Sequence, residues 1–174
     1  VLTVVASYGA FLLAWAMGNI VLFTAVHRGS RVTIAESMSI YRVLQVGVVL
    51  IAAGTLLGGM WADQAWGRFW GWDPKEVWAL VILLCYLVPL HLRYAGVVGP
   101  TALAGWAVFG FLSVLMSWYG VNFLLGAGKH AYATGKGFAD SFSEDQVIVL
   151  GLSMAQVAVT SWQLLTLRAT RAGE

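Results

Sequence analysis

The chain has 174 residues, of which 60% are hydrophobic and 10% are charged, and its mean hydropathy is +0.79. A soluble domain is about 45 to 50% apolar and about 25% charged, so the composition indicates a membrane protein that resides in the lipid bilayer. The net charge is +2 and the few charged residues fall in short clusters, which argues against nucleic acid as a partner.

Five stretches are long and apolar enough to cross a membrane. A helix needs roughly 20 apolar residues to span the hydrocarbon, and it satisfies its own backbone polar groups. The stretches are residues 1–26, 40–60, 77–93, 97–118 and 146–167. The first run is too long for a cleavable signal, so we expect it to stay in the bilayer. We predict an all-α fold, a polytopic transmembrane helix bundle of about five spans, with residues 1–174 forming a single transmembrane domain.

The charges predict how these spans are oriented. An odd number of spans puts residues 27–39, residues 94–96 and the C-terminal tail on one side, and residues 61–76 and 119–145 on the other. The first side carries six Arg against two acids, and the second carries four Lys or Arg against six acids. The positive-inside rule therefore makes the first side cytoplasmic and the second external.

Residues 61–78, the tryptophan segment, are the most unusual part of the sequence. Five of the chain's nine tryptophans lie here: Trp61, Trp66, Trp70, Trp72 and Trp78. An aromatic belt at the membrane interface would explain two or three of them. However, the spacing is irregular, and Gly67 and Gly71 interrupt any helix that would hold them on one stripe. We expect an interfacial segment that lays the indoles side by side as a platform for a large, flat, apolar ligand.

Charged residues accompany the platform and suit haem. Arg68 and Lys75 can meet an anionic edge, and indole N–H groups can donate to carboxylates. The cluster that follows also has a structural explanation. Asp73 is a good N-cap, Pro74 suits the first helical position, and Glu76 completes a capping box. We favour that structural role for the acidic residues.

The chain has three histidines, and each has a structural alternative. His130, in a glycine-rich loop on the external side, is either solvated or an axial ligand of haem on the platform. His91 ends the third span on the cytoplasmic side, where a helix C-terminus favours a histidine. His27 is interpreted as part of a solvated positive flank. Cys85, the single cysteine, is expected to pack within a span.

Three motifs resemble a known family. The stretch WGRFWGWDPKEVWALV, residues 66–81, resembles the WWD signature of haem-handling membrane proteins, a superfamily that includes the CcmC, CcmF and CcsA (also ResC) cytochrome c biogenesis proteins. DPKE followed by VWAL resembles the CcsA branch; the CcmF branch would have DPVEN. VPLHLR, residues 88–93, and GVNFLLGAGKHAY, residues 120–132, are similar to the YLHxR and GVN…G…LHSY motifs of CcsA proteins.

The resemblance implies a ligand and its binding residues. The ligand is haem b, iron protoporphyrin IX, held at the WWD segment with His130 as one of two external histidine ligands. The other would lie just before Val1. His91 matches a histidine that ligates haem received from the cytoplasm. The residues implied to bind haem are Trp61, Trp66, Trp70, Trp72, Asp73, Trp78, His91 and His130, the two histidines being the iron ligands.

The resemblance also implies an activity. The chain would be part of a System II cytochrome c synthase of the cell (plasma or inner) membrane, a haem lyase that joins haem to the CxxCH thiols of apocytochrome c at the periplasmic face. A CcsB (also ResB) type membrane protein would be its partner, separate or fused upstream. Two alternatives remain: a haem transporter or chaperone of the CcmC type without ligation activity, and a structural membrane subunit. No residue is expected to act as a general acid or base.

Overall fold

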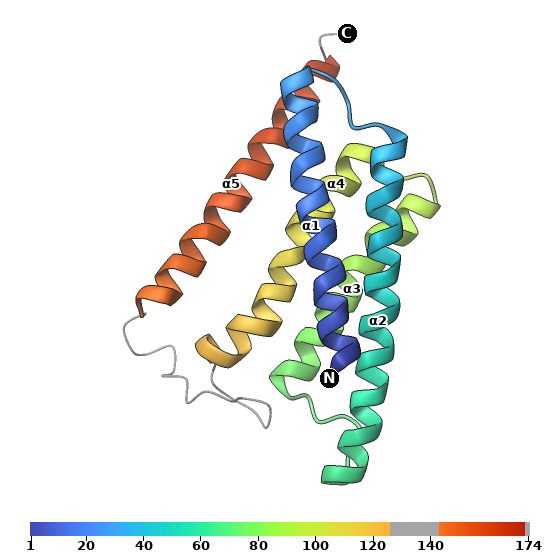
Figure 1. The fold of residues 1–174 in the computed structure, drawn as a ribbon, viewed down its shortest axis with the longest axis vertical. Coiled ribbons are helices and arrows are strands. Elements are labelled where there is room, and N and C mark those ends of the chain that lie inside the picture. The colour runs from blue at the N-terminus through green and yellow to red at the C-terminus, as the bar shows by residue number, and fades with distance from the viewer. Residues whose placement is uncertain (126–142, 173–174) are drawn as a thin grey trace.

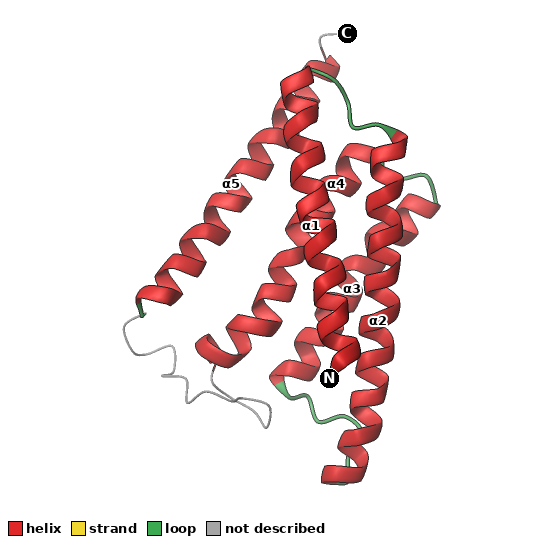
Figure 2. Ribbon diagram, viewed as in Figure 1, coloured by secondary structure: helices red, strands yellow, loops and turns green. Residues whose placement is uncertain are grey.

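The computed structural model describes residues 1–125 and 143–172, and all the regular structure in these two ranges is helical (Figures 1 and 2). The elements in chain order are α1 (Leu2–Arg28), α2 (Ile34–Trp66), α3 (Pro74–Tyr94), α4 (Pro100–Leu115), the π-helical segment η1 (Met116–Leu125) and α5 (Glu144–Ala172). With η1 continuing α4, the described residues form five helices long and apolar enough to cross a membrane. The predicted all-α, multi-span fold is confirmed.

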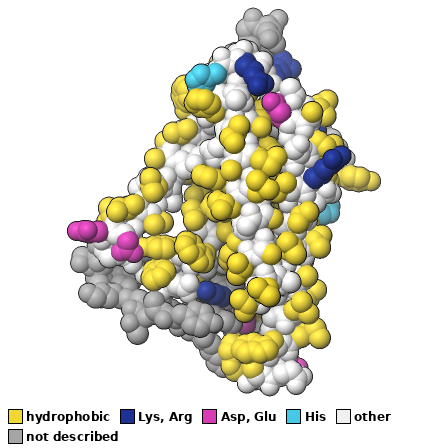
Figure 3. All heavy atoms as spheres, viewed as in Figure 1, with side chains coloured by type: hydrophobic (Ala, Val, Ile, Leu, Met, Phe, Trp, Pro, Cys, Tyr) yellow, Lys and Arg dark blue, Asp and Glu magenta, His cyan; other side chains and the backbone are white. Residues whose placement is uncertain are grey.

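Successive helices run in opposite directions, so their connections alternate between two ends of the bundle (Figure 1). One end, which we call the tryptophan end, carries residues 67–73, the close of η1 and the first turn of α5. The opposite end, the arginine end, is marked by Arg28, Arg31, Arg93 and Arg168. In the view of Figure 3, hydrophobic side chains cover most of the surface between the ends, and charged side chains lie mainly toward them.

Helix α2 is longer than its apolar stretch at both ends. It begins six positions before residue 40, where Thr33 and Glu36 form a capping box, and it ends six positions after residue 60. Its 33 residues extend about 50 Å, against about 30 Å of hydrocarbon in a bilayer. The last turns of α2 therefore project beyond its neighbours at the tryptophan end (Figure 1).

The core is organised around one aromatic stack. The rings of Phe11 and Tyr86 lie 4.1 Å apart at an interplanar angle of 6°, and both residues are fully buried. A Cβ added at Gly47 would lie 2.5 Å from the Phe11 ring, and one at Gly110 would lie 2.7 Å from the Tyr86 ring. The stack joins α1 to α3, and it fits because α2 and α4 each place a glycine beside one of its rings.

Polar contacts attach the last elements to α1. On α5, Gln156 Nε2 donates to Asn19 Oδ1 at 2.9 Å and to Thr160 Oγ1 at 2.8 Å. Nearer the tryptophan end, the Tyr8 hydroxyl lies 2.9 Å from that of Ser117 on η1. Such bonds are favourable inside a bilayer, where a lone polar group has few partners. The rest of α5 exposes many apolar side chains, as a lipid-facing helix does.

Candidate functional site

The first two tryptophans of the segment lie on a helix. Trp61 and Trp66 occupy the last turns of α2, and their rings meet edge to face, with centroids 5.1 Å apart at 77°. Gly67 then ends the helix in the left-handed conformation, φ 68°, and its N–H donates to the carbonyl of Asp63 at 2.8 Å. The helix ends at Gly67, as predicted, but it extends past the apolar stretch 40–60 and therefore carries this first pair of tryptophans. The intervening ADQA sequence contains good helix formers, and a helix leaving the membrane need not remain apolar.

The connection from α2 to α3 folds back against α2. A Cβ at Gly59 would lie 2.7 Å from the Phe69 ring, so the missing side chain is what admits that ring. The Arg68 guanidinium crosses Gly71 so closely that any side chain there would overlap it. The Phe69 contact places the start of the connection against α2, and residues 67–73 have no regular structure of their own.

The next pair of tryptophans projects from this connection. The rings of Trp70 and Trp72 meet edge to face, with centroids 5.9 Å apart at 89°. Trp72 is 71% exposed and its backbone is left-handed, with φ 56°. For a residue other than glycine this conformation costs about 1–2 kcal/mol. The indoles thus form edge-to-face pairs, because aromatic quadrupoles favour this arrangement over parallel rings lying side by side.

The cap of α3 follows Trp72 directly in the chain. Asp73 is the N-cap: it is 95% buried, and its Oδ1 accepts the N–H of Lys75 at 3.0 Å. Oε2 of Glu76 accepts the N–H of Asp73 at 3.1 Å and that of Gly71 at 2.7 Å. With Pro74 in the first turn, the predicted capping box is present. Trp78 follows one turn into α3 and is partly buried.

His91 lies at the other end of α3 and is exposed. Its Nδ1 is 2.8 Å from the carbonyl of Leu87, which can only accept, so Nδ1 carries the proton. In the neutral ring, Nε2 then keeps the lone pair that a metal needs. The same contact occurs at the end of α1, between His27 Nδ1 and the Phe23 carbonyl at 3.0 Å. Ring geometry alone therefore does not distinguish His91 from an ordinary helix-terminal histidine.

The structure separates the predicted haem-binding residues into two regions. His91 is 17 positions beyond Pro74, a distance of about 26 Å along a helix. The indoles of the tryptophan end and His91 therefore cannot contact one porphyrin together. His91 thus lies at the arginine end, opposite the tryptophan segment, and its predicted ligation of haem on the inner side stays a prediction.

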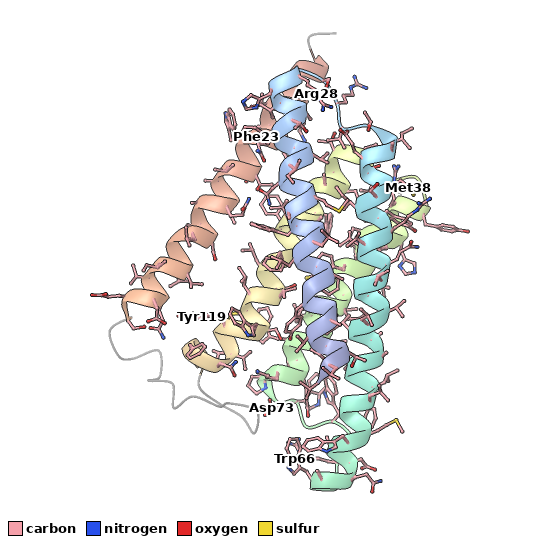
Figure 4. All side chains as sticks on the ribbon, viewed as in Figure 1. Phe23, Arg28, Met38, Trp66, Asp73 and Tyr119 are labelled. Carbon is pink, nitrogen blue, oxygen red and sulfur yellow. The ribbon has the colours of Figure 1, made fainter. Side chains whose placement is uncertain are left out.

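His130 lies outside the described residues, and its predicted ligation stays a prediction. The residues that flank 126–142 are placed, however. Gln146 Nε2 donates to the Phe123 carbonyl at 2.7 Å, and the Tyr119 hydroxyl donates to Asp145 at 2.5 Å. These bonds join η1 to the start of α5 at the tryptophan end. Figure 4 labels Tyr119, Asp73 and Trp66 toward that same end.

Two features of this region were not foreseen from the sequence. One is the close contact of the Phe69 ring with Gly59. The Gly58-Gly59 pair near the end of the second span could have indicated such a close approach. The other is η1, ten residues of π-helix, a form found frequently at functional sites. A groove of about 890 Å³ also lies at the arginine end, away from the tryptophan segment, and Arg31, Trp106, Leu164 and Arg168 are among the residues lining it.

The exposed side chains at the tryptophan end suit a large aromatic ligand. Trp61 and Trp72 expose most of their indole surface, and the cationic Arg68 and Lys75 stand in the same segment. Over residues 1–125 and 143–172, no group of three or more His, Cys, Asp or Glu is arranged to hold a metal ion. The arrangement can bind an apolar ring system with acidic substituents, with a metal ligand supplied from elsewhere.

Comparison with known proteins gives consistent matches. The family model described as cytochrome C assembly protein matches residues 1–127, which include the tryptophan segment and His91. Protein NrfI of Wolinella succinogenes is 40% identical over 129 residues, covering 73% of this chain and 14% of that protein.

Two cytochrome c biogenesis proteins CcsA are also similar. The one from Trachelium caeruleum is 41% identical over 99 residues, covering 57% of this chain and 31% of the relative. The one from Prochlorococcus marinus (strain MIT 9515) is 45% identical over 92 residues, covering 53% and 29%. The chain thus matches about a third or less of the length of these relatives.

Proposed function

The chain belongs to the cytochrome C assembly protein family, and on this premise we propose that it binds haem b at the tryptophan end and presents it to apocytochrome c. In this proposal residues 1–174 are one transmembrane haem-handling domain, a component of a System II cytochrome c haem lyase. Haem and the CxxCH segment of the apocytochrome are its substrates. The reaction joins the haem vinyl groups to the two cysteine thiols.

The observation that carries the proposal is the set of exposed indoles held on a fixed backbone. Trp61 and Trp72 are 58% and 71% exposed, although a large aromatic side chain gains free energy by burial. The connection that bears Trp72 is held by the contact of Phe69 with Gly59 and by the Glu76 carboxylate, which accepts the N–H groups of Gly71 and Asp73. Exposed aromatic groups on a rigid support are pre-organised to bind a flat ligand, because little backbone freedom remains to be lost.

Each part of the site then has a binding role. Trp70 and Trp72 contact the porphyrin face or edge, and Arg68 and Lys75 attract its propionates. His130 supplies an axial imidazole, because the segment that contains it joins η1 to α5, whose adjoining ends lie at the tryptophan end. The protein contributes binding and orientation, and the reactive groups belong to the two substrates. Asp73 shapes the pocket through its cap on α3.

The charges at the arginine end support an external position for the site. Arg28, Arg31, Arg93 and Arg168 gather there, and the positive-inside rule assigns such an end to the cytoplasm. In the cell (plasma or inner) membrane the tryptophan end then faces the periplasmic side, where haem would be joined to the thiols of apocytochrome c. We further propose a CcsB or ResB type membrane protein as the partner.

A second candidate function is haem transport without ligation, of the CcmC type. A ligand-competent imidazole of His91 at the arginine end would give haem a binding position on each side of the membrane, and it is compatible with both candidates. In both candidates haem reaches the tryptophan end. They differ in whether covalent attachment happens there.

Co-expression with an apocytochrome c, in a host whose own maturation systems are deleted, separates the candidates. The proposal predicts a haem-stained cytochrome band that survives denaturation, together with a Soret band in the purified membrane protein. Bound haem without covalent cytochrome would support the transporter. A protein purified without any Soret band would contradict both and leave a structural subunit.

A further inference from the structure

Trp72 has an unusual backbone for its residue type. In the two described ranges it is the one residue other than glycine with a positive φ, 56°. This region of backbone space crowds the Cβ of an L residue, and a bulky side chain is rarely found there. Such a residue persists only where its surroundings hold it, and cases of this kind cluster at binding sites. The contacts that hold Trp72 are therefore informative.

Burial of the indole does not explain the conformation. The Trp72 side chain is 71% exposed, and its recorded ring contact is the edge-to-face approach to Trp70. A strained residue in a hydrophobic core can be held by the apolar surface it buries, but little of this indole is buried. The force that fixes Trp72 must therefore act on the backbone around it.

The carboxylate of Glu76 supplies that force. The N–H groups of Gly71 and Asp73, one on each side of Trp72, both donate to the same oxygen, Oε2, at 2.7 and 3.1 Å. Two such donors converge on one acceptor only when the chain between them turns sharply. Successive N–H groups that surround an anion in this way form a nest, a backbone arrangement that commonly includes a left-handed residue. Here that residue is Trp72.

The bond to Gly71 is more than a capping box requires. A capping box needs the Glu side chain to accept only the N-cap N–H, which at α3 is that of Asp73. The chain contains a second capping box for comparison, at the start of α2. There Glu36 Oε2 accepts the N–H of Thr33 at 2.8 Å and the Thr33 hydroxyl at 2.8 Å, and Thr33 has an ordinary φ of −76°.

We propose that Glu76 is a positioning residue for haem binding: its carboxylate holds residues 71–73 so that Trp72 presents its indole at the tryptophan end. The inference rests on the proposed function, because it assumes that Trp72 contacts haem. Glu76 itself touches no ligand and acts only through the backbone of Trp72. Its role as a cap is kept, and the nest adds a second role to the same carboxylate.

The first test measures the turn without haem. The protein is labelled with 5-fluorotryptophan in detergent micelles, and the ¹⁹F signal of Trp72 is identified by its loss in Trp72→Phe. We expect Glu76→Ala to shift or broaden this signal. Glu76→Gln retains an oxygen that can accept both N–H groups and should leave the signal near its original position. Glu36→Ala removes the matching capping box at α2 and should not move it.

The second test measures whether Glu76 acts through Trp72. Haem is titrated into the same variants and followed by Soret absorbance. Glu76→Ala should weaken binding roughly threefold to tenfold, the range expected when one side chain must be ordered on binding. In the double variant with Trp72→Ala, removal of Glu76 should cause no further loss, because the residue it positions is gone.

The outcomes distinguish a failure of the positioning role of Glu76 from a failure of the proposed haem-binding function. A Trp72 signal that is unchanged in Glu76→Ala, or losses that add in the double variant, would overturn the positioning role. A signal that moves as expected in a protein that binds no haem would uphold the nest and contradict the proposed function. If Glu76→Ala does not fold, Glu76→Asp replaces it. The shorter carboxylate cannot reach both N–H groups, so the Trp72 signal must still move.

Discussion

Replacing Trp70 and Trp72 by alanine tests whether these tryptophans bind a ligand or only pack within the protein. Trp70→Ala with Trp72→Ala removes two indoles from a connection whose backbone is held by other contacts, those of Phe69 with Gly59 and of Glu76 with Gly71 and Asp73. Trp72 is 71% exposed and Trp70 is only partly buried, so neither belongs to the buried core and the double variant should fold. Each aromatic contact with a porphyrin is worth about 0.5–1.5 kcal/mol beyond the area it buries.

Two lost contacts amount to about 1–3 kcal/mol, which weakens haem binding from about fivefold to more than a hundredfold. The assay is haem titration in detergent, followed by Soret absorbance, with thermal unfolding measured on the same samples. The matched control is Trp162→Ala, a 58% exposed tryptophan on the outer face of α5. Equal losses of affinity in the pair and in Trp162→Ala would refute the reasoning and assign the tryptophan segment to membrane anchoring.

The core and the arginine end give further predictions. Gly47→Ala should lower the thermal unfolding temperature relative to Gly58→Ala, because its Cβ would lie 2.5 Å from Phe11, whereas nothing lies within 4 Å at Gly58. Both changes gain the same helix propensity, so the difference isolates overpacking, about 1–3 kcal/mol. Equal unfolding temperatures would contradict the stacked core. His91→Ala should leave the Trp72-dependent haem affinity unchanged, because the two regions lie about 26 Å apart; a parallel loss of affinity would place both in one site.

The sequence predicted the number and type of spans well, for a physical reason. Crossing a bilayer requires about 20 apolar residues in a helix, and this requirement is local enough to read from composition. The same criterion missed the helix ends. Helix α2 continues through Ala62, Asp63, Gln64 and Ala65 to Trp66, because a helix may extend past the hydrocarbon with polar residues. The capping boxes at Asp73 and Thr33 depend on residues three apart, and the first was predicted for that reason.

The geometry of the site was only partly predictable. The grouping of indoles and charges is visible in the sequence, as is the interruption at Gly67. The seat of Phe69 against Gly59 is not, because it depends on how the connection folds back over α2. The left-handed backbone of Trp72 contradicts the residue's own preference and arises from the Glu76 carboxylate. Sequence reasoning fails here because local propensity is overridden by a specific contact.

Axial ligation at His130 tests the central claim most directly. The measurement is the Soret spectrum and haem content of protein purified with His130→Gly, before and after imidazole is added to fill the space of the missing side chain. If haem is held at the tryptophan end by His130, the His130→Gly variant should contain less haem and show an altered Soret band. Added imidazole should restore both. A spectrum and haem content equal to those of the unaltered protein would contradict ligation by His130 and the haem site proposed beside the tryptophans.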